Sequence, residues 1–249
     1  MRVLTASELL SVWERGLSQS PLARAEALLA AAWPGSTSDS LAGLTLGRRD
    51  ARLLQLREAV FGPIMNALAT CEACGENVEM EFSASDIRSG SGGEAHGPEA
   101  IDVIVEGHEL TLRIPTGADL AVAAEARSLL AARQTLIQRL VLTAKRAGEP
   151  VAASGLSADL IAEAGRLLAA ADPQADIRID LTCPACGRNW QEEFGILSFF
   201  WSEIQGWAAR ILREVHELAR AYHWREADIL ALSPWRRQAY LNMLSGAGD

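Results

Sequence analysis

The C-terminal fifth of the chain carries the most regular pattern of apolar positions. Large apolar side chains recur there at steps of three and four residues, which places them on one face of an α-helix. This apolar face consists of Phe200, Ile204, Trp207, Ile211, Val215, Leu218 and Tyr222. The pattern predicts one long amphipathic helix, then a short helix at 225–232 and a final helix at 235–244. Ser233 and Pro234 supply the cap and the first residue of that final helix.

Three adjacent aromatic residues, Phe199, Phe200 and Trp201, flank the start of the long helix. One interpretation places them in the core of the C-terminal half, with the rest of the apolar face. In the other, they partly face a partner protein, because aromatic side chains are enriched at protein–protein interfaces. The pattern alone is consistent with both interpretations.

The N-terminal third also shows helical periodicity. We expect a helix capped by Ser7, a second helix that begins at Pro21 and ends before Pro34, and a third from about 47 to 61. The third helix has an arginine-rich polar side. That side indicates either a solvated surface or a patch for a partner.

Alternation with a period of two indicates strands in the middle of the chain. Val78, Met80 and Phe82 alternate with glutamates, and the stretch 177–181 alternates apolar with charged residues. The other expected elements are a hairpin of strands at 101–105 and 109–114, a flexible loop at 89–98, a helical stretch at 118–146 and a helix at 158–171.

These patterns predict an α+β fold that is mainly helical. We divide the chain into an N-terminal helical segment at 1–62, a β region at 63–199 and a C-terminal helical segment at 200–249. The β region carries a helical insertion at 118–171. We expect the three segments to form one composite globular domain.

Composition narrows the range of environments and partners. The chain has 249 residues and a formal net charge of −9. Its N-terminus lacks the apolar stretch of a signal peptide, and no apolar run reaches the length that spans a bilayer. We therefore expect a cytoplasmic protein without a membrane partner. The acidic balance also disfavours binding to phosphate backbones, so no nucleic-acid partner is expected.

The four cysteines form two copies of one short motif. The stretches 70–82 and 182–194 match at 8 of 13 positions, and each contains Cys-x-x-Cys-Gly. The spacer between Cys74 and Cys183 is 108 residues long. Glycine after the second cysteine allows a positive φ, so that the backbone can turn its N–H groups toward the sulfurs. We call each copy a knuckle.

The two knuckles supply four thiolates, from Cys71, Cys74, Cys183 and Cys186. Four thiolates complete the tetrahedral shell of a structural zinc ion. We therefore predict one structural Cys₄ zinc site, in a zinc-ribbon-like β element that the fold must close.

Two other uses of the cysteines stay open. A thioredoxin-like redox site needs a single Cys-x-x-Cys at a strand-to-helix junction, whereas both motifs here lead into strand-like stretches. Disulfide bonds suit a secreted chain. His96, in the predicted loop, is either solvated or an additional metal contact.

Sequence motifs for catalysis are missing. The stretch 216–220 begins like the metalloprotease motif His-Glu-x-x-His but ends in arginine. A phosphate-binding loop, a Gly-x-Ser-x-Gly elbow and a dinucleotide-binding glycine motif are not found either. We therefore expect no enzymatic activity and no small-molecule substrate. The stretch 225–240 has some features of a helix-turn-helix, so a zinc-ribbon regulator that binds nucleic acid is the alternative function.

Several short motifs resemble a known family. They are Trp13-Glu14-Arg15-Gly16, Leu46-Gly47-Arg48-Arg49-Asp50, Arg113-Ile114-Pro115-Thr116, Asp172-Pro173-Gln174-Ala175-Asp176, Phe199-Phe200-Trp201-Ser202-Glu203-Ile204, Leu212-Arg213-Glu214-Val215-His216 and Ala231-Leu232-Ser233-Pro234-Trp235-Arg236-Arg237, with the two knuckles among them. Together they resemble the T-even phage-type baseplate protein family, which occurs in phage tails and contractile injection system clusters.

The resemblance runs over nearly the whole chain and is most specific in its C-terminal part. It implies a structural or assembly protein of the baseplate or central hub, with other hub proteins as partners. It implies no catalytic residues. It is compatible both with a cytoplasmic assembly chaperone and with a component that stays in the finished tail-like particle.

Overall fold

The computed structural model describes residues 1–89 and 98–246. Most of the predicted loop at 89–98, with His96, lies outside the described residues. Within the described part of the chain, no helix is both long and apolar enough to cross a membrane.

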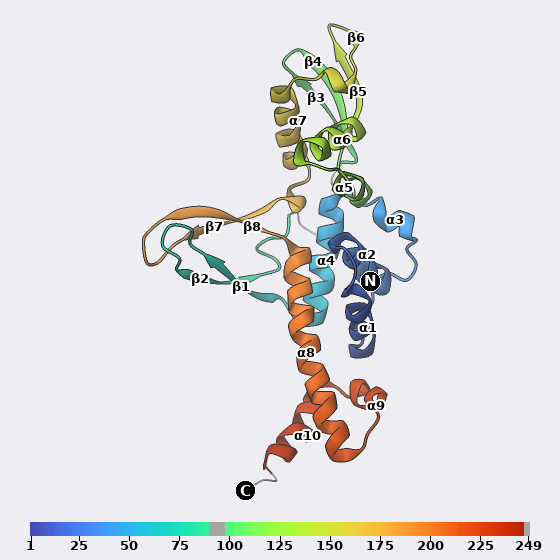
Figure 1. Ribbon diagram of the computed structural model, residues 1–249, viewed down its shortest axis with the longest axis vertical. Helices are drawn as coiled ribbons and strands as arrows, with labels where there is room; N and C mark the ends of the chain where they lie inside the picture. Colours follow the sequence, from blue (N-terminus) through green and yellow to red (C-terminus); the bar gives the residue numbers. More distant parts are fainter. Residues whose placement is uncertain (90–97, 247–249) are drawn as a thin grey trace. The chain divides into compact units, whose positions relative to one another are not determined.

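The chain combines helices with small β-sheets, as predicted (Figure 1). Its contacts divide it into two compact units. The helical unit consists of residues 1–34 and 197–249, and the mixed unit of residues 35–196. The sequence-based division into three segments stays a prediction.

Among the described residues of the helical unit, all regular secondary structure is α-helical. The helices are α1 (Ala6–Gly16), α2 (Pro21–Ala32), α8 (Ile196–Tyr222), α9 (Glu226–Ala231) and α10 (Pro234–Gly246). Helix α8 is the long amphipathic helix that the apolar face predicted. Its buried residues Ile211, Val215 and Leu218 belong to one apolar cluster with buried residues of α1, α9 and α10.

The first helix begins earlier than expected, because Thr5 caps it instead of Ser7. The Thr5 hydroxyl accepts a hydrogen bond from the Glu8 N–H at 3.3 Å, and the Glu8 carboxylate accepts one from the Thr5 N–H at 3.0 Å. This reciprocal pair is a capping box, which satisfies two backbone donors at the helix start.

Phe200 and Trp201 are buried and belong to the core, so these two residues do not face a partner, whereas Phe199 is half-buried. Trp201 lies against Gly16 of α1, where an added Cβ would be 2.2 Å from the indole ring. The Arg24 guanidinium lies over the same ring, 4.6 Å from its centroid, in a cation–π contact. Glycine is therefore required at position 16 to make room for the indole.

Arg237 joins α10 to α8. Its guanidinium is buried and donates to the Glu214 carboxylate at 2.9 Å and to the Leu232 carbonyl at 2.6 Å. The Ser233 hydroxyl accepts from the Arg236 N–H at 3.3 Å and caps the helix start. In the alternative interpretation of 225–240 as a helix-turn-helix, the second helix would present its arginines to DNA, whereas Arg237 is buried and packs α10 against α8.

The mixed unit contains the remaining elements. They are α3 (Ser38–Ala42), α4 (Leu46–Phe61), β1 (Ile64–Thr70), β2 (Asn77–Ser83), β3 (Ala100–Val105), β4 (His108–Arg113), α5 (Gly117–Ala124), α6 (Leu129–Leu140), β5 (Val141–Arg146), β6 (Glu149–Pro150), the 3₁₀ turn Ala153–Gly155, α7 (Ala158–Ala171), the 3₁₀ turn Pro173–Ala175, β7 (Ile177–Thr182) and β8 (Asn189–Phe194).

The segment between the two knuckles in the sequence contains a four-stranded antiparallel sheet with the order β3-β4-β5-β6. One face of this sheet forms an apolar core with α6 and α7. The core contains Val105, Leu110, Leu112, Ile114, Leu140, Ala144, Leu160, Ala164 and Leu168. The opposite face carries polar residues such as Thr111 and Thr143, whose hydroxyls lie 2.9 Å apart.

The helical stretch predicted at 118–146, in one or two pieces, is wrong in its last part. Two helices, α5 at 117–124 and α6 at 129–140, take up the first part, and 141–146 forms strand β5 beside β4. A two-residue turn of Ala147 and Gly148 then leads to β6, with φ values of 51° and 85°. Such turns are usually announced by Asn-Gly or Asp-Gly. Because alanine occupies the first position of this turn, the sequence lacks that hairpin motif and β5 was not predicted.

Two of the motifs, 46–50 and 172–176, meet in space. Asp172 follows α7, is buried, and accepts a hydrogen bond from the Gly47 N–H of α4 at 2.8 Å. An added Cβ on Gly47 would lie 1.8 Å from the Asp172 carboxylate oxygen. This contact fixes α4 against the end of α7, although 125 residues separate the partners.

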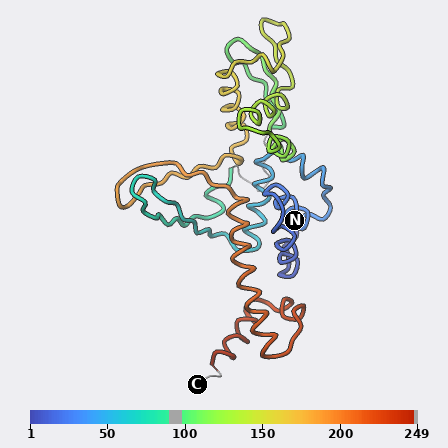
Figure 2. The backbone as a smooth tube through the Cα atoms, in the orientation of Figure 1, coloured from blue at the N-terminus to red at the C-terminus, as the bar shows by residue number. Residues whose placement is uncertain are grey.

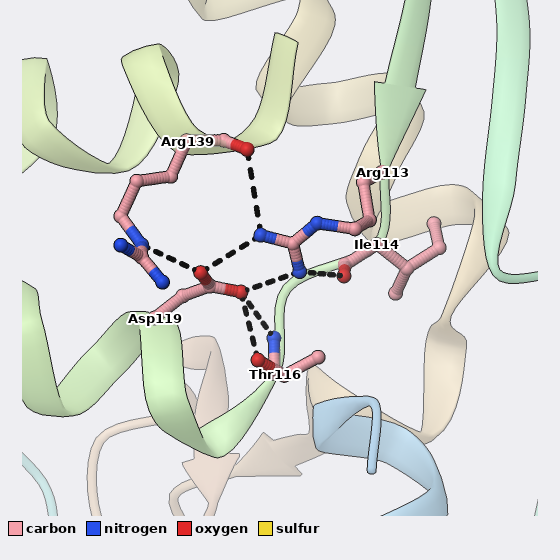
Figure 3. A network of polar contacts seen from close by, with 5 residues as sticks. All are labelled: Arg113, Ile114, Thr116, Asp119 and Arg139. Atoms are coloured by element: carbon pink, nitrogen blue, oxygen red, sulfur yellow. Dashed lines mark hydrogen bonds and ion pairs between the residues drawn. The ribbon is translucent and has the colours of Figure 1, made fainter. Parts of the chain in front are cut away.

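Asp119 is the centre of a second polar network, which Figure 3 shows. Its fully buried carboxylate accepts from the Arg113 guanidinium at 2.8 and 2.9 Å, from Arg139 Nε at 2.8 Å, and from the Thr116 N–H and hydroxyl. Burial alone raises the pKa of this carboxyl. The two guanidinium groups and Thr116 outweigh it and hold the pKa well below its usual range.

Gly47→Ala should lower the free energy of unfolding by about 2–4 kcal/mol, because the methyl group displaces the buried Asp172 carboxylate. Urea denaturation followed by circular dichroism measures this change. The matched control is Gly165→Ala in α7, where no heavy atom lies within 4 Å of the added Cβ. The control should be neutral or stabilising by up to about 1 kcal/mol. Equal stability of both variants would contradict the proposed close contact.

Asp119→Asn should lower the free energy of unfolding by about 3 kcal/mol at pH 7, because it leaves two arginines without their shared anion. Since the folded pKa lies below the unfolded value of about 3.9, the contribution of Asp119 is full above that value. It is lost as the pH falls through the folded pKa. The difference in the free energy of unfolding between variant and parent should therefore shrink between about pH 4 and about pH 2. The exposed control Glu149→Gln should differ little from the parent throughout; a pH-independent deficit of Asp119→Asn would contradict the linkage.

Candidate metal centre

Two β-hairpins of the mixed unit carry the four cysteines. Strands β1 and β2 form the first hairpin, and β7 and β8 form the second. Figure 2 shows the two hairpins running beside one another, in teal and in orange. The rings of Phe82 and Phe194 meet edge to face between them, with centroids 5.3 Å apart. These phenylalanines occupy matching positions of the two motif copies.

The turn at the end of each hairpin has the same backbone hydrogen bonds. In the first, Cys71 N–H donates to the Glu76 carbonyl and Gly75 N–H to the Cys71 carbonyl, both at 2.8 Å. In the second, Cys183 N–H donates to the Arg188 carbonyl at 2.8 Å and Gly187 N–H to the Cys183 carbonyl at 2.9 Å.

Glycine closes both turns in the left-handed region. The φ values are 78° at Gly75 and 74° at Gly187, which only glycine adopts without a steric cost. A side-chain hydrogen bond at the base of each turn also repeats. Thr70 donates to Asn77 at 3.0 Å, and Thr182 donates to Asn189 at 2.7 Å. The sequence similarity of the two copies is therefore a similarity of structure.

The fold brings the four predicted cysteines into one cluster. Cys71 Sγ lies 3.7 Å from Cys186 Sγ, and Cys74 Sγ lies 3.6 Å from Cys183 Sγ. All four sulfurs lie within 4.8 Å of one another. Both short distances join the two hairpins and are far longer than the S–S bond of about 2.0 Å in a disulfide. The cysteines are free thiols.

These distances fit a tetrahedral metal ion. Bonds of about 2.3 Å from a zinc ion to four sulfurs give S···S edges of about 3.8 Å. The donor set therefore suits a metal that prefers thiolates, and the four cysteines could hold one such ion. Cys71 and Cys183 are buried, whereas Cys74 and Cys186 are exposed at the tip.

The thiol pKa values reflect the crowding of four sulfurs. Burial raises the pKa of Cys71, but the backbone N–H groups of Cys74 and Ala73 outweigh it and lower that pKa to about 7. For Cys74 the Glu76 N–H lowers the pKa, but contact with Cys183, burial and the other thiols raise it to about 12. Four thiols that cannot all ionise alone can do so around a divalent cation.

An ion pair supports the cluster from outside. Arg188, which follows the second cysteine pair, donates to Glu72 of the first turn at 3.3 Å. Both side chains are solvent-accessible, so this pair adds little energy. It does align the two turns across the cluster.

The structure describes no other group of three or more cysteine, histidine or acidic residues that could hold a metal in residues 1–89 and 98–246. His96 lies outside these residues. The sequence analysis did not single out Asp119, although Thr116 and Asp119 have the spacing of a capping box. The Gly47–Asp172 contact leaves no such local signal, because its partners are 125 residues apart.

A family model described as T4 bacteriophage base plate protein matches residues 25–201. The match covers both cysteine pairs and more than two thirds of the chain. Among curated proteins and among solved structures, no match was found.

Replacing Cys183 and Cys186 together by serine should abolish metal binding and destabilise the mixed unit, because the binding energy at such a site is folding energy. Metal analysis of the purified parent should give one divalent ion per chain and the variant none. The melting temperature should fall by about 10 °C or more. Glu193→Gln, on the same hairpin, is the control and should keep metal and stability.

If the double variant does not fold, a chelator titration of the parent gives the same information. Removal of the ion should lower the melting temperature, and readdition should restore it. A parent without metal, or a variant with unchanged stability, would contradict the site.

Proposed function

Because the chain belongs to the T4 bacteriophage base plate protein family, we propose that it is a non-enzymatic structural or assembly protein of a baseplate. We place it at the central hub of a phage tail-like contractile injection system. Its partners are then other hub proteins, and neither nucleic acid, membrane nor small-molecule substrate is required. The observation that carries this proposal is the family match over residues 25–201.

We further propose that the cysteine cluster binds zinc and that the ion is structural. Bound zinc supplies four strong bonds that join the hairpins. Cys71, Cys74, Cys183 and Cys186 fill all four positions of a tetrahedral ion, which leaves none for a substrate. The ion therefore stabilises the fold and takes no part in a reaction.

The family-like motifs support a structural role because their polar residues bind one another. Gly47 contacts Asp172, Arg113 contacts Asp119, and Glu214 contacts Arg237. Charged groups used in this way stabilise the packing of elements far apart in sequence. A catalytic group would instead need access to a substrate.

The regulator hypothesis fits less well. All of the formal net charge of −9 falls in residues 35–196, which include the cysteine cluster. An acidic surface repels phosphate groups, and nucleic-acid binding would require a basic one. We therefore retain nucleic-acid binding only as an outcome of the test.

Deleting the gene in its native host should abolish contractile particles or leave them without a complete baseplate. Electron microscopy of purified particles checks this, and expression of the gene from a plasmid is the control. Quantitative mass spectrometry then compares particles with the lysate. A fixed ratio to sheath and spike proteins indicates a built-in component, whereas presence in the lysate alone indicates an assembly factor in the cytoplasm.

Normal particles from the deletion strain would overturn the baseplate proposal. The regulator hypothesis predicts instead that the purified chain binds DNA with an affinity that falls steeply with salt. Its binding to a labelled duplex at low salt distinguishes the two classes of function.

A further inference from the structure

An apolar groove lies between α6 and α7 of the mixed unit (Figure 1). Its cavity has a volume of about 300 Å³. The lining includes Leu136, Ile137 and Leu140 of α6 and Ile161 and Leu168 of α7. None of the four cysteines lines it, so the groove is separate from the metal centre. A cavity of this size and composition accommodates a large apolar side chain.

The rim of the groove is open along α7. Gly165 and Ala169 stand one helical turn apart there, and both are exposed. A Cβ added to Gly165 would have no heavy atom within 4 Å. None of the described lining residues belongs to a strand, so an extended peptide would find no backbone edge to pair with. Small residues on one wall and apolar residues on the other suit a helix that packs into the groove.

Helix α6 extends the apolar surface beyond the cavity. Leu129 is 88% exposed and Leu130 is 68% exposed. These leucines precede Arg133 by four and three positions, and Arg133 precedes Ile137 by four, so all of them lie along one side of the helix. Neighbouring leucines exposed to this extent are typical of an interaction site. A helix that covers them and fills the cavity passes directly over Arg133.

The charge that remains free at the groove is positive. Three charged residues line it, and two of them have partners within the chain. Asp172 is buried and accepts from the Gly47 N–H at 2.8 Å. Asp176 binds the Arg178 guanidinium at 3.1 and 3.2 Å. Arg133 is exposed and makes no hydrogen bond or ion pair with any other residue that the structure describes.

Helix α6 has no acidic residue of its own to neutralise Arg133. Its other arginine, Arg139, is already bound to Asp119. A guanidinium matches the two oxygens of a carboxylate in geometry as well as in charge. An occupant of the groove therefore gains from a carboxylate beside its apolar anchor, whereas a basic group at the same place is repelled.

We propose that the α6–α7 groove is the docking site for an acidic amphipathic helix of a partner protein. A large apolar side chain of that helix fills the cavity, and an aspartate or glutamate three or four positions away binds Arg133. A second apolar side chain covers Leu129 and Leu130. The groove itself determines this class of partner, so the proposal does not rest on the baseplate function.

Fluorescence anisotropy with two labelled peptides tests the proposal on the full-length protein. Both are helical peptides of about 15 residues with the same apolar face. One carries glutamates beside that face, and the other carries lysines at the same positions. At low salt the parent should bind the acidic peptide at least about tenfold more tightly than the basic one, and added salt should reduce this preference.

Variants separate the contribution of the charge from that of the cavity. Arg133→Gln should remove the preference for the acidic peptide, and Arg133→Glu should reverse it. Gly165→Phe fills the cavity and should weaken the binding of both peptides; if it does not fold, Ala169→Phe on the same rim replaces it. Circular dichroism checks the fold of each variant.

Two matched controls should behave like the parent. Arg127→Gln changes the net charge as Arg133→Gln does, but at an exposed arginine outside the groove lining. Gly165→Ala adds only a methyl group to the rim. Equal affinity of the parent for the two peptides, an unchanged preference in Arg133→Gln, or no binding up to about 1 mM peptide would overturn the proposal.

Cross-linking in the native host identifies the occupant. A photo-reactive side chain in place of Ala169 is activated there, and mass spectrometry gives the sequence of the cross-linked peptide. The proposal predicts a helix with a carboxylate three or four positions from a large apolar residue. Lysine in place of that carboxylate should abolish the cross-link, and Arg133→Glu should restore it. A cross-linked segment of this same chain, or one without a carboxylate, would contradict the proposal.

Discussion

The close approach of Cys71 and Cys74 to Cys183 and Cys186 is the constraint on which the mixed unit depends. It brings together two hairpins whose cysteine turns are separated by 108 residues. Closing a loop of that length costs chain entropy, although the cost grows only slowly with loop length. Four bonds to the proposed ion would offset this cost at a single point. They would hold the segment between the hairpins, with the sheet and helices α5 to α7, at both of its ends.

A second long-range contact joins the segments that precede the two hairpins. The hydrogen bond between Gly47 and Asp172 connects the helix before the first hairpin to the turn before the second. The cysteine cluster joins the hairpins at their tips, and this hydrogen bond joins the segments that enter them. Together they explain why the family-like motifs are spread along the chain in separate short pieces. Each piece supplies one half of a long-range contact.

What the sequence could reveal depends on how local the signal is. The cysteine turns, with glycine at a positive φ, are written in five consecutive residues, and the long apolar face of α8 in a simple period. Strand β5 was missed because the apolar residues of 118–140 run into it without a clear turn. Trp201 was ambiguous because its neighbour Gly16 is 185 residues away in the chain. The Asp119 network has the same limit, since Arg139 approaches it only through the packing of α6.

The duplicated hairpin has a consequence for how the protein is made. Each hairpin carries half of a ligand set, so the first pair of thiols leaves the ribosome without the second. At roughly 5–20 residues per second, synthesis of the intervening segment takes about 5–20 s. During that interval Cys71 and Cys74 can offer a metal only two ligands, and the two thiols are open to oxidation. The complete set of four ligands therefore exists only after the second hairpin has emerged, so a metal ion that needs all four thiols can bind only then, and the first two thiols must stay reduced until that point.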